Sequence, residues 1–186
     1  IGWKKTVDSW QASVGSKETL IIQSKVNGEK PETINTKIIT PKSKTIWMHC
    51  ASLGEFEQGR PLLEAVKTNY PDHKIILTFF SPSGYEIRKN YEGADLIMYL
   101  PMDSIANASN FINAINPALV LWIKYEYWYY YLSELKKRKI PVLLISGIFR
   151  PGQVFFRWYG FVWKQILESF EHLFVQTERS QQLLQS

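Results

Sequence analysis

Residues 49–55 are His49-Cys50-Ala51-Ser52-Leu53-Gly54-Glu55, and they join an apolar run at 46–48 to a periodic apolar run at 61–66. A short β-prone run, a turn of small residues and a helical pattern are typical of the first strand, turn and helix of an α/β unit. In open α/β sheets, ligands bind beyond the carboxyl ends of the strands, where the first helical turn offers free backbone N–H groups. The stretch therefore predicts a turn that faces a ligand, with Glu55 in its helical part.

The rest of the chain continues this alternation of strands and helices. Apolar runs predict strands at 74–80, 94–100, 118–123, 142–146 and 172–176, and helical patterns lie at 85–91, 103–115, 127–139 and 155–170. We expect Asp103 to cap the second of these helices, which ends at Asn116-Pro117. The order predicts an α/β fold with a Rossmann-like, mostly parallel sheet and helices on both faces.

The chain divides into a polar segment and one domain. Residues 1–44 are polar and contain glycine and proline, so we expect an irregular, partly mobile segment there and a single Rossmann-like domain over 45–186. The sequence begins at Ile1 and ends within a helical pattern. We therefore expect a fragment of a longer protein.

Composition limits the classes of function. The net charge of +5 favours an anionic partner. A single cysteine, Cys50, excludes an internal disulfide and a cysteine-based metal cage, and the three histidines have no ligand spacing. No dinucleotide fingerprint, P-loop or apolar run of about 20 residues is present. The sequence thus predicts no cofactor, no metal and no membrane-spanning helix.

Three predicted turns converge on the carboxyl edge of the sheet, at 52–55, 81–84 and 124–126. The first two are rich in hydroxyl residues and glycine, which lets a backbone approach an oxyanion closely. In the third, Lys124 and Glu126 point the same way on an extended segment. Two plainer interpretations stay open, because Glu55 also suits the helix dipole and the other two charges also suit an ordinary ion pair.

Two aromatic segments lie at 128–131 and 155–164. Packing of two helices accounts for their inward rings. Rings interleaved with Arg157 and Lys164, near a basic run at 136–139, are also typical of a membrane surface or of a groove for the acyl part of a lipid. No RNA-binding aromatic motif is present, so a nucleic-acid partner is not expected.

Five motifs, taken together, resemble a known family. They are His49–Phe56, Ser81–Glu86, Leu100–Asp103, Lys124–Trp128 and Phe174–Gln176. This set, from about Thr45 to the C-terminus, resembles the N-terminal half of the Kdo (3-deoxy-D-manno-octulosonic acid) transferases of lipopolysaccharide biosynthesis. The resemblance implies the N-terminal half of a B-type glycosyltransferase fold, at the cytoplasmic face of the bacterial inner membrane. It also implies a lipid A precursor as acceptor and CMP-Kdo as donor, the latter bound mainly by a C-terminal domain absent from this chain.

The resemblance assigns roles to individual residues. It implies that Glu55 is the general base of an inverting transfer of Kdo, since a sugar hydroxyl must lose its proton as it attacks. It places Lys124 and Glu126 as organising groups of the site. Ser52, Gly54, Ser83 and Gly84 then shape the backbone around the acceptor sugar or a phosphate.

The chain departs from the family at one position and leaves one alternative function. Many members carry Asn-Ala-Arg where this chain has Ser146-Gly147-Ile148. Two interpretations are open: Arg150 supplies the missing guanidinium to the acceptor, or the acceptor contacts differ there. We expect the fragment to be inactive without its donor domain. The alternative is a non-catalytic module that binds a lipid or another anion on its basic aromatic face.

Overall fold

The computed structural model describes residues 44–124, 126–156 and 160–185. The strands are β1 (Thr45–Cys50), β2 (Lys74–Phe79), β3 (Leu96–Tyr99), β4 (Pro117–Ile123), β5 (Val142–Gly147) and β6 (His172–Val175). The helices are α2 (Leu53–Asn69), α3 (Pro82–Arg88), α4 (Ile105–Ile115), α5 (Tyr129–Lys137), α6 (Phe161–Leu167) and α7 (Glu178–Gln185), with a 3-10 turn η1 (Val154–Phe156). The irregular segment expected at 1–44 lies outside the described residues except for Lys44, and so do Arg157 and Tyr125.

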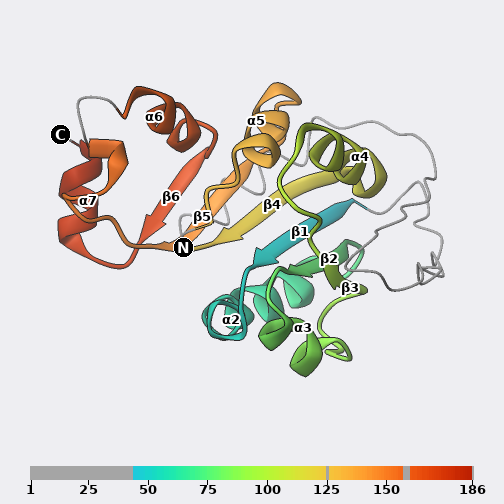
Figure 1. Ribbon diagram of the computed structural model, residues 1–186. Helices are drawn as coiled ribbons and strands as arrows, with labels where there is room; N and C mark the ends of the chain where they lie inside the picture. Colours follow the sequence, from blue (N-terminus) through green and yellow to red (C-terminus); the bar gives the residue numbers. More distant parts are fainter. Residues whose placement is uncertain (1–43, 125, 157–159, 186) are drawn as a thin grey trace.

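All neighbouring strands pair in parallel, in the order β3-β2-β1-β4-β5-β6 (Figure 1). From β1 the chain winds outward through β2 to β3, then returns beside β1 as β4 and winds the other way. In such sheets a crevice opens at the carboxyl ends of the two strands where the winding reverses. Here those strands are β1 and β4. The predicted Rossmann-like fold is confirmed.

Both faces of the sheet are covered by helices. On β1, Trp47 belongs to a core shared with α4 and α5, whereas Met48 belongs to a second core shared with α2. The same alternation runs along β4, where Trp122 and Ile123 point to opposite cores. The nearly continuous apolar strands are therefore explained by burial on both faces. No helix among the described residues is long and apolar enough to cross a membrane.

Two predicted features of the helices were wrong. The aromatic stretch 155–170 is not one helix, because η1 ends at Phe156 and α6 starts only at Phe161, after Gly160. Asp103 does not cap α4, whose N-cap is Ser104, with Oγ accepting from the Asn107 N–H at 3.2 Å. Asp103 instead accepts backbone N–H groups of Tyr130 and Tyr131 at 3.1 and 3.2 Å, and so caps α5 from the loop after β3.

His49 is a fully buried histidine in the core beneath the crevice. Its Nδ1 lies 2.9 Å from Thr78 Oγ1, which also accepts the Trp47 indole N–H at 2.8 Å. Burial lowers the pKa of His49 from 6.5 to about 3, outweighing a hydrogen bond with Thr78. The imidazole is therefore neutral in the folded chain at neutral pH.

This neutral histidine predicts acid sensitivity of the fold. Below about pH 6.5 the unfolded chain gains a proton on His49 that the folded chain takes up only near its pKa of about 3. Between pH 7 and pH 5, we expect His49 to account for a loss of about 2 kcal/mol in the free energy of unfolding. Urea unfolding at both pH values should show this loss reduced in His49→Gln but not in His172→Gln, which changes an exposed histidine. Equal losses of unfolding free energy in the unchanged chain and in both variants would contradict this prediction.

Candidate functional site

Glu55 lies in the first turn of α2, at the carboxyl end of β1. Its Oε2 accepts the backbone N–H of Ala51 at 2.6 Å, and the residue is only 9% exposed. Ser52 is the N-cap but makes no capping bond with its side chain, and the Glu55 carboxylate bonds with the backbone of Ala51 and Ser52 just ahead of the helix. Glu55 is thus a first-turn acid, as the plainer interpretation expects. Its backbone bonds hold the carboxylate at the carboxyl end of β1.

The surroundings of Glu55 raise the pKa of its carboxyl. The main cause is burial, and the negative charge of Glu126 adds to it. The Ala51 and Ser52 backbone bonds and the positive charge of Lys124 lower the pKa in part. The charges of Lys124 and Glu126 therefore both act on the Glu55 carboxyl, so the structure brings these three predicted residues together. A carboxylate with a raised pKa is better suited to accept a proton near neutral pH.

Two indoles hold the segment after β4 in place. The Trp122 Nε1–H donates to the backbone oxygen of Glu126, and the Trp128 Nε1–H donates to Glu126 Oε2 at 2.7 Å. Lys124 has a φ of 63°, a left-handed conformation that is uncommon without glycine, and its N–H donates to Ile145 O at 3.0 Å. The segment is thus anchored to the core and to β5.

The first two predicted turns are joined through Ala51. Its carbonyl oxygen accepts the N–H groups of Phe80 and Ser81 at 3.3 and 2.7 Å, so the turn after β2 lies beside the turn after β1. Ser83 is exposed, and its hydroxyl lies 3.0 Å from that of Ser81. Gly54 is exposed and has open space where a Cβ would be. These positions are accessible to a ligand.

Gly84 has a clear packing role. It is buried, and a Cβ added there would lie 2.2 Å from Cδ1 of the Phe79 ring. The first turn of α3 can therefore pack on β2 only because residue 84 lacks a side chain. This close contact accounts for the glycine without any ligand.

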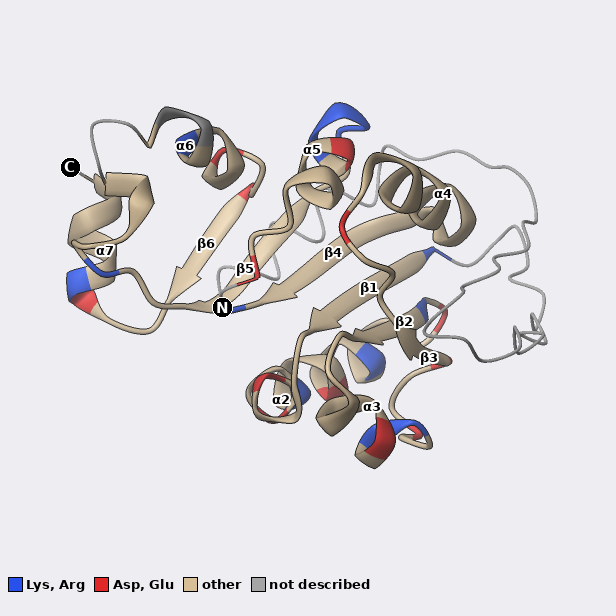
Figure 2. Cartoon of the chain, viewed as in Figure 1, with Lys and Arg blue, Asp and Glu red and all other residues tan. Residues whose placement is uncertain are grey.

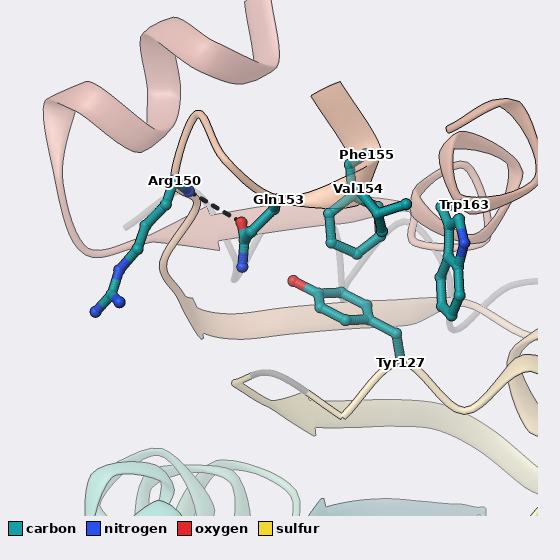
Figure 3. A pocket seen from close by; sticks show the side chains of 6 residues that line it. All are labelled: Tyr127, Arg150, Gln153, Val154, Phe155 and Trp163. Carbon is teal, nitrogen blue, oxygen red and sulfur yellow. Dashed lines mark hydrogen bonds between the residues drawn. The ribbon is translucent and has the colours of Figure 1, made fainter. Parts of the chain in front are cut away.

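Arg150 lies in the loop after β5 and is exposed. Its backbone N–H donates to Gln153 Oε1 at 2.9 Å, and its side chain lines a pocket with Tyr127, Phe155 and Trp163 (Figure 3). Arg150, the residue predicted to replace the family's guanidinium, therefore lies beside an aromatic pocket.

Sequence reasoning missed a polar cluster at the ends of β5 and β6. Gln176 Nε2 donates to Ser146 Oγ at 2.5 Å and to Gln58 Oε1 at 3.2 Å, and Ser146 Oγ donates to the same Gln58 oxygen at 3.2 Å. Gln58 follows Glu55 by three residues, and this spacing puts the two side chains on one face of α2. That spacing, and the position of Gln176 within a family motif, were the available signals.

Comparison with solved structures supports the fold. A crystal structure of UDP-N-acetylglucosamine 2-epimerase matches with a TM-score of 0.54 and 14% identity, covering 77% of this chain and 45% of that chain. A putative UDP-N-acetylglucosamine 2-epimerase from Listeria monocytogenes matches with a TM-score of 0.52 and 13% identity, covering 77% and 42%. At these identities the likeness concerns the fold alone.

Three curated relatives share the name 3-deoxy-D-manno-octulosonic acid transferase. The protein from Haemophilus influenzae is 30% identical over 108 residues, which are 58% of this chain and 25% of the relative. That from Chlamydia trachomatis serovar D is 26% identical over 145 residues, or 77% and 30%. That from Aquifex aeolicus is 29% identical over 103 residues, or 55% and 28%. The chain thus matches between a quarter and a third of the length of these relatives.

The family comparison covers more of the chain than the motifs did. The profile described as 3-Deoxy-D-manno-octulosonic-acid transferase (kdotransferase) matches residues 22–186, so the similarity starts ahead of Thr45, where the motifs begin. Because this match spans most of the sequence, the chain belongs to the 3-deoxy-D-manno-octulosonic-acid transferase family.

Proposed function

We propose that the full-length protein transfers Kdo from CMP-Kdo to a lipid A precursor with inversion, and that this chain is its acceptor-binding half. The observation that carries the proposal is the buried Glu55 carboxylate at the carboxyl end of β1, whose pKa is raised by burial and by Glu126 and lowered in part by Lys124. The names of the family and of the relatives support the class of reaction.

The proposed chemistry is a single displacement. A hydroxyl of the acceptor sugar attacks the anomeric carbon of Kdo, and the bond from that carbon to the CMP phosphate oxygen breaks. CMP leaves with the electron pair of that bond, and attack from the opposite side inverts the configuration. Glu55 accepts the hydroxyl proton as the new bond forms, because the alcohol is too weak an acid to lose it earlier.

The other predicted residues have supporting roles in this proposal. Ser52, Gly54 and Ser83 lie on the two joined turns and contact the acceptor sugar or its phosphate. Lys124 contributes a positive charge beside Glu55. Gly84 contributes by letting α3 pack closely on β2.

The charges around Glu55 make the acid limb of the pH profile a test of this function. We expect Glu126→Gln in the full-length protein to move the acid limb of kcat/KM to lower pH, because it removes a negative charge that raises the Glu55 pKa. Lys124→Met should move the limb to higher pH, since the lysine charge lowers that pKa. Glu64→Gln, an exposed change on α2, should leave it in place. An unmoved limb in both site variants would show that another group titrates.

We also propose that the protein lies at the cytoplasmic face of the inner membrane, with α5 toward the lipid. The exposed face of α5 carries Tyr129 and Tyr130 at its start and Lys136 and Lys137 seven residues later, and Figure 2 shows basic residues gathered at its C-terminal end. Further exposed apolar side chains, on the loop after β3 and the start of α4, are Met102 and Ile105. Exposed rings followed by lysines suit an anionic lipid surface.

Neutralising the lysines of α5 should weaken membrane binding. Each lysine near an anionic surface contributes about 1 kcal/mol, so we expect Lys136→Gln with Lys137→Gln to lower partitioning into phosphatidylglycerol-containing vesicles about 30-fold. The matched control is Lys67→Gln with Lys89→Gln, which removes equal charge from α2 and the end of α3. Vesicle flotation measures both. Equal losses in the two pairs would indicate attraction by net charge alone.

The same surface keeps the second candidate function open. A non-catalytic module that binds a lipid or another anion would use this basic aromatic face and would not need Glu55. Lipid binding without Kdo transfer by the full-length protein would favour the module.

A further inference from the structure

A pocket of about 550 Å³ opens between the loop after β4, the loop after β5 and α6. Figure 3 shows the side chains that line it, which are Tyr127, Arg150, Gln153, Val154, Phe155 and Trp163. Its size is within the range of small-molecule sites, about 300–1,000 Å³. Of the residues that the sequence analysis placed at the acceptor, Arg150 is the one that lines this pocket.

The inner part of the pocket is apolar and aromatic. The Tyr127 and Phe155 rings lie 4.7 Å apart at 68°, and the Phe155 and Trp163 rings lie 6.2 Å apart at 87°. Because neighbouring rings meet edge to face, they form walls and not two parallel faces that could hold a flat base between them. Phe155 is buried, whereas Trp163 is 41% exposed. The walls therefore suit a flexible hydrocarbon chain.

The other end of the pocket carries a positive charge. Arg150 is exposed and, among the residues that the structure describes, has no carboxylate within ion-pair distance. Figure 3 shows its guanidinium directed away from the rings, with Gln153 between them. The side-chain oxygen Oε1 of Gln153 already accepts the Arg150 backbone N–H, so the charged group that the polar end offers is the guanidinium. That group pairs well with phosphate.

We propose that this pocket binds an acyl chain of the acceptor, with an acceptor phosphate at Arg150. The proposal rests on the proposed function, since it names how that acceptor is held. Tyr127 directly follows Glu126, whose carboxylate faces Trp128 and contributes to the field at Glu55. An acyl chain bound against Tyr127 therefore lies beside the proposed reaction site.

Photocrosslinking of the full-length enzyme tests the location. The probe is an acylated glucosamine disaccharide phosphate with a diazirine at the end of one acyl chain. We expect the label on residues that line the pocket, above all Val154 and Phe155, and a loss of labelling by at least tenfold in Val154→Trp, which fills the pocket. Ile87→Trp, an added indole at a 60% exposed position of α3, should label as the unchanged enzyme does. Label concentrated on Met102, Ile105 and Tyr130, or protection by CMP alone, would overturn the proposal.

Kinetics provide a second test that does not depend on the folding of one variant. The ratio of kcat/KM for the acylated acceptor to that for the deacylated acceptor should fall at least tenfold in Val154→Trp. Arg150→Gln should raise KM at least tenfold for the phosphorylated acceptor and much less for the dephosphorylated one. An Arg150→Gln enzyme that treats both acceptors alike contradicts the phosphate contact. If the unchanged enzyme transfers no Kdo, the proposed function fails, and crosslinking still reports on the pocket.

Discussion

Glu55→Gln in the full-length protein is expected to lower kcat for Kdo transfer by about 10²–10⁴-fold, the usual contribution of a general base. Glutamine keeps an oxygen that can accept the Ala51 N–H, now bonded to Glu55 Oε2 at 2.6 Å, so the start of α2 should be preserved. It cannot accept the proton of the acceptor hydroxyl. A transfer assay at saturating acceptor and donor measures the loss.

The matched control for this variant is Glu57→Gln, two residues further along α2. Glu57 is ion-paired with Arg60 and Arg88 at the surface, at 3.1 and 2.5 Å. Its replacement should leave kcat within about twofold, because surface ion pairs contribute little to stability and Glu57 has no proposed role in proton transfer. If Glu55→Gln kept more than a tenth of the original turnover in a folded enzyme, the assignment of the base would be wrong.

Trp122→Ala is expected to have the largest effect on stability, lowering the free energy of unfolding by about 3–5 kcal/mol. Trp122 is fully buried in β4, with its ring centroid 5.5 Å from that of Trp47 and 4.7 Å from that of His49. Removing the indole leaves a cavity among packed strands, which relax only in part. The variant also removes the indole N–H that binds the backbone of Glu126, so the site is loosened with the core.

Urea unfolding of the chain, followed by circular dichroism, measures this effect, with Trp163→Ala as the matched control. Trp163 is 41% exposed on α6, so its loss should reduce the free energy of unfolding by less than about 1 kcal/mol. Similar losses in the two variants would mean that β4 is not the centre of the core.

The sheet and the position of Glu55 were predictable because both depend on local patterns. Apolar runs such as 118–123 show burial on both faces, and small residues before a helical pattern mark the turn after β1. The parallel arrangement then brings the ends of β1 and β4 together.

The features that were not predictable depend on contacts between distant residues. Asp103 and Ser104 are both good N-caps, and only the folded chain shows that Asp103 turns to a helix start 27 residues away. The left-handed conformation of Ser146, with φ of 65°, supports the contacts to Gln58 and Gln176, and no local signal marks it. Gly160, which lies within the aromatic stretch and is the N-cap of α6, is a local signal for the start of that helix.

The backbone of Ala51 makes hydrogen bonds on both sides, one to Glu55 and the others to the turn after β2. Its N–H donates to the Glu55 carboxylate and its carbonyl oxygen accepts from Phe80 and Ser81, so main-chain atoms of Ala51 tie the proposed base to the neighbouring turn. Among the contacts of the described residues, the Ser83 hydroxyl meets that of Ser81 and does not reach Glu55. If the proposed function holds, those side chains can be varied to accept different sugars while the Glu55 carboxylate keeps its place, whereas a proline at position 51 would remove the N–H that Ala51 donates to it.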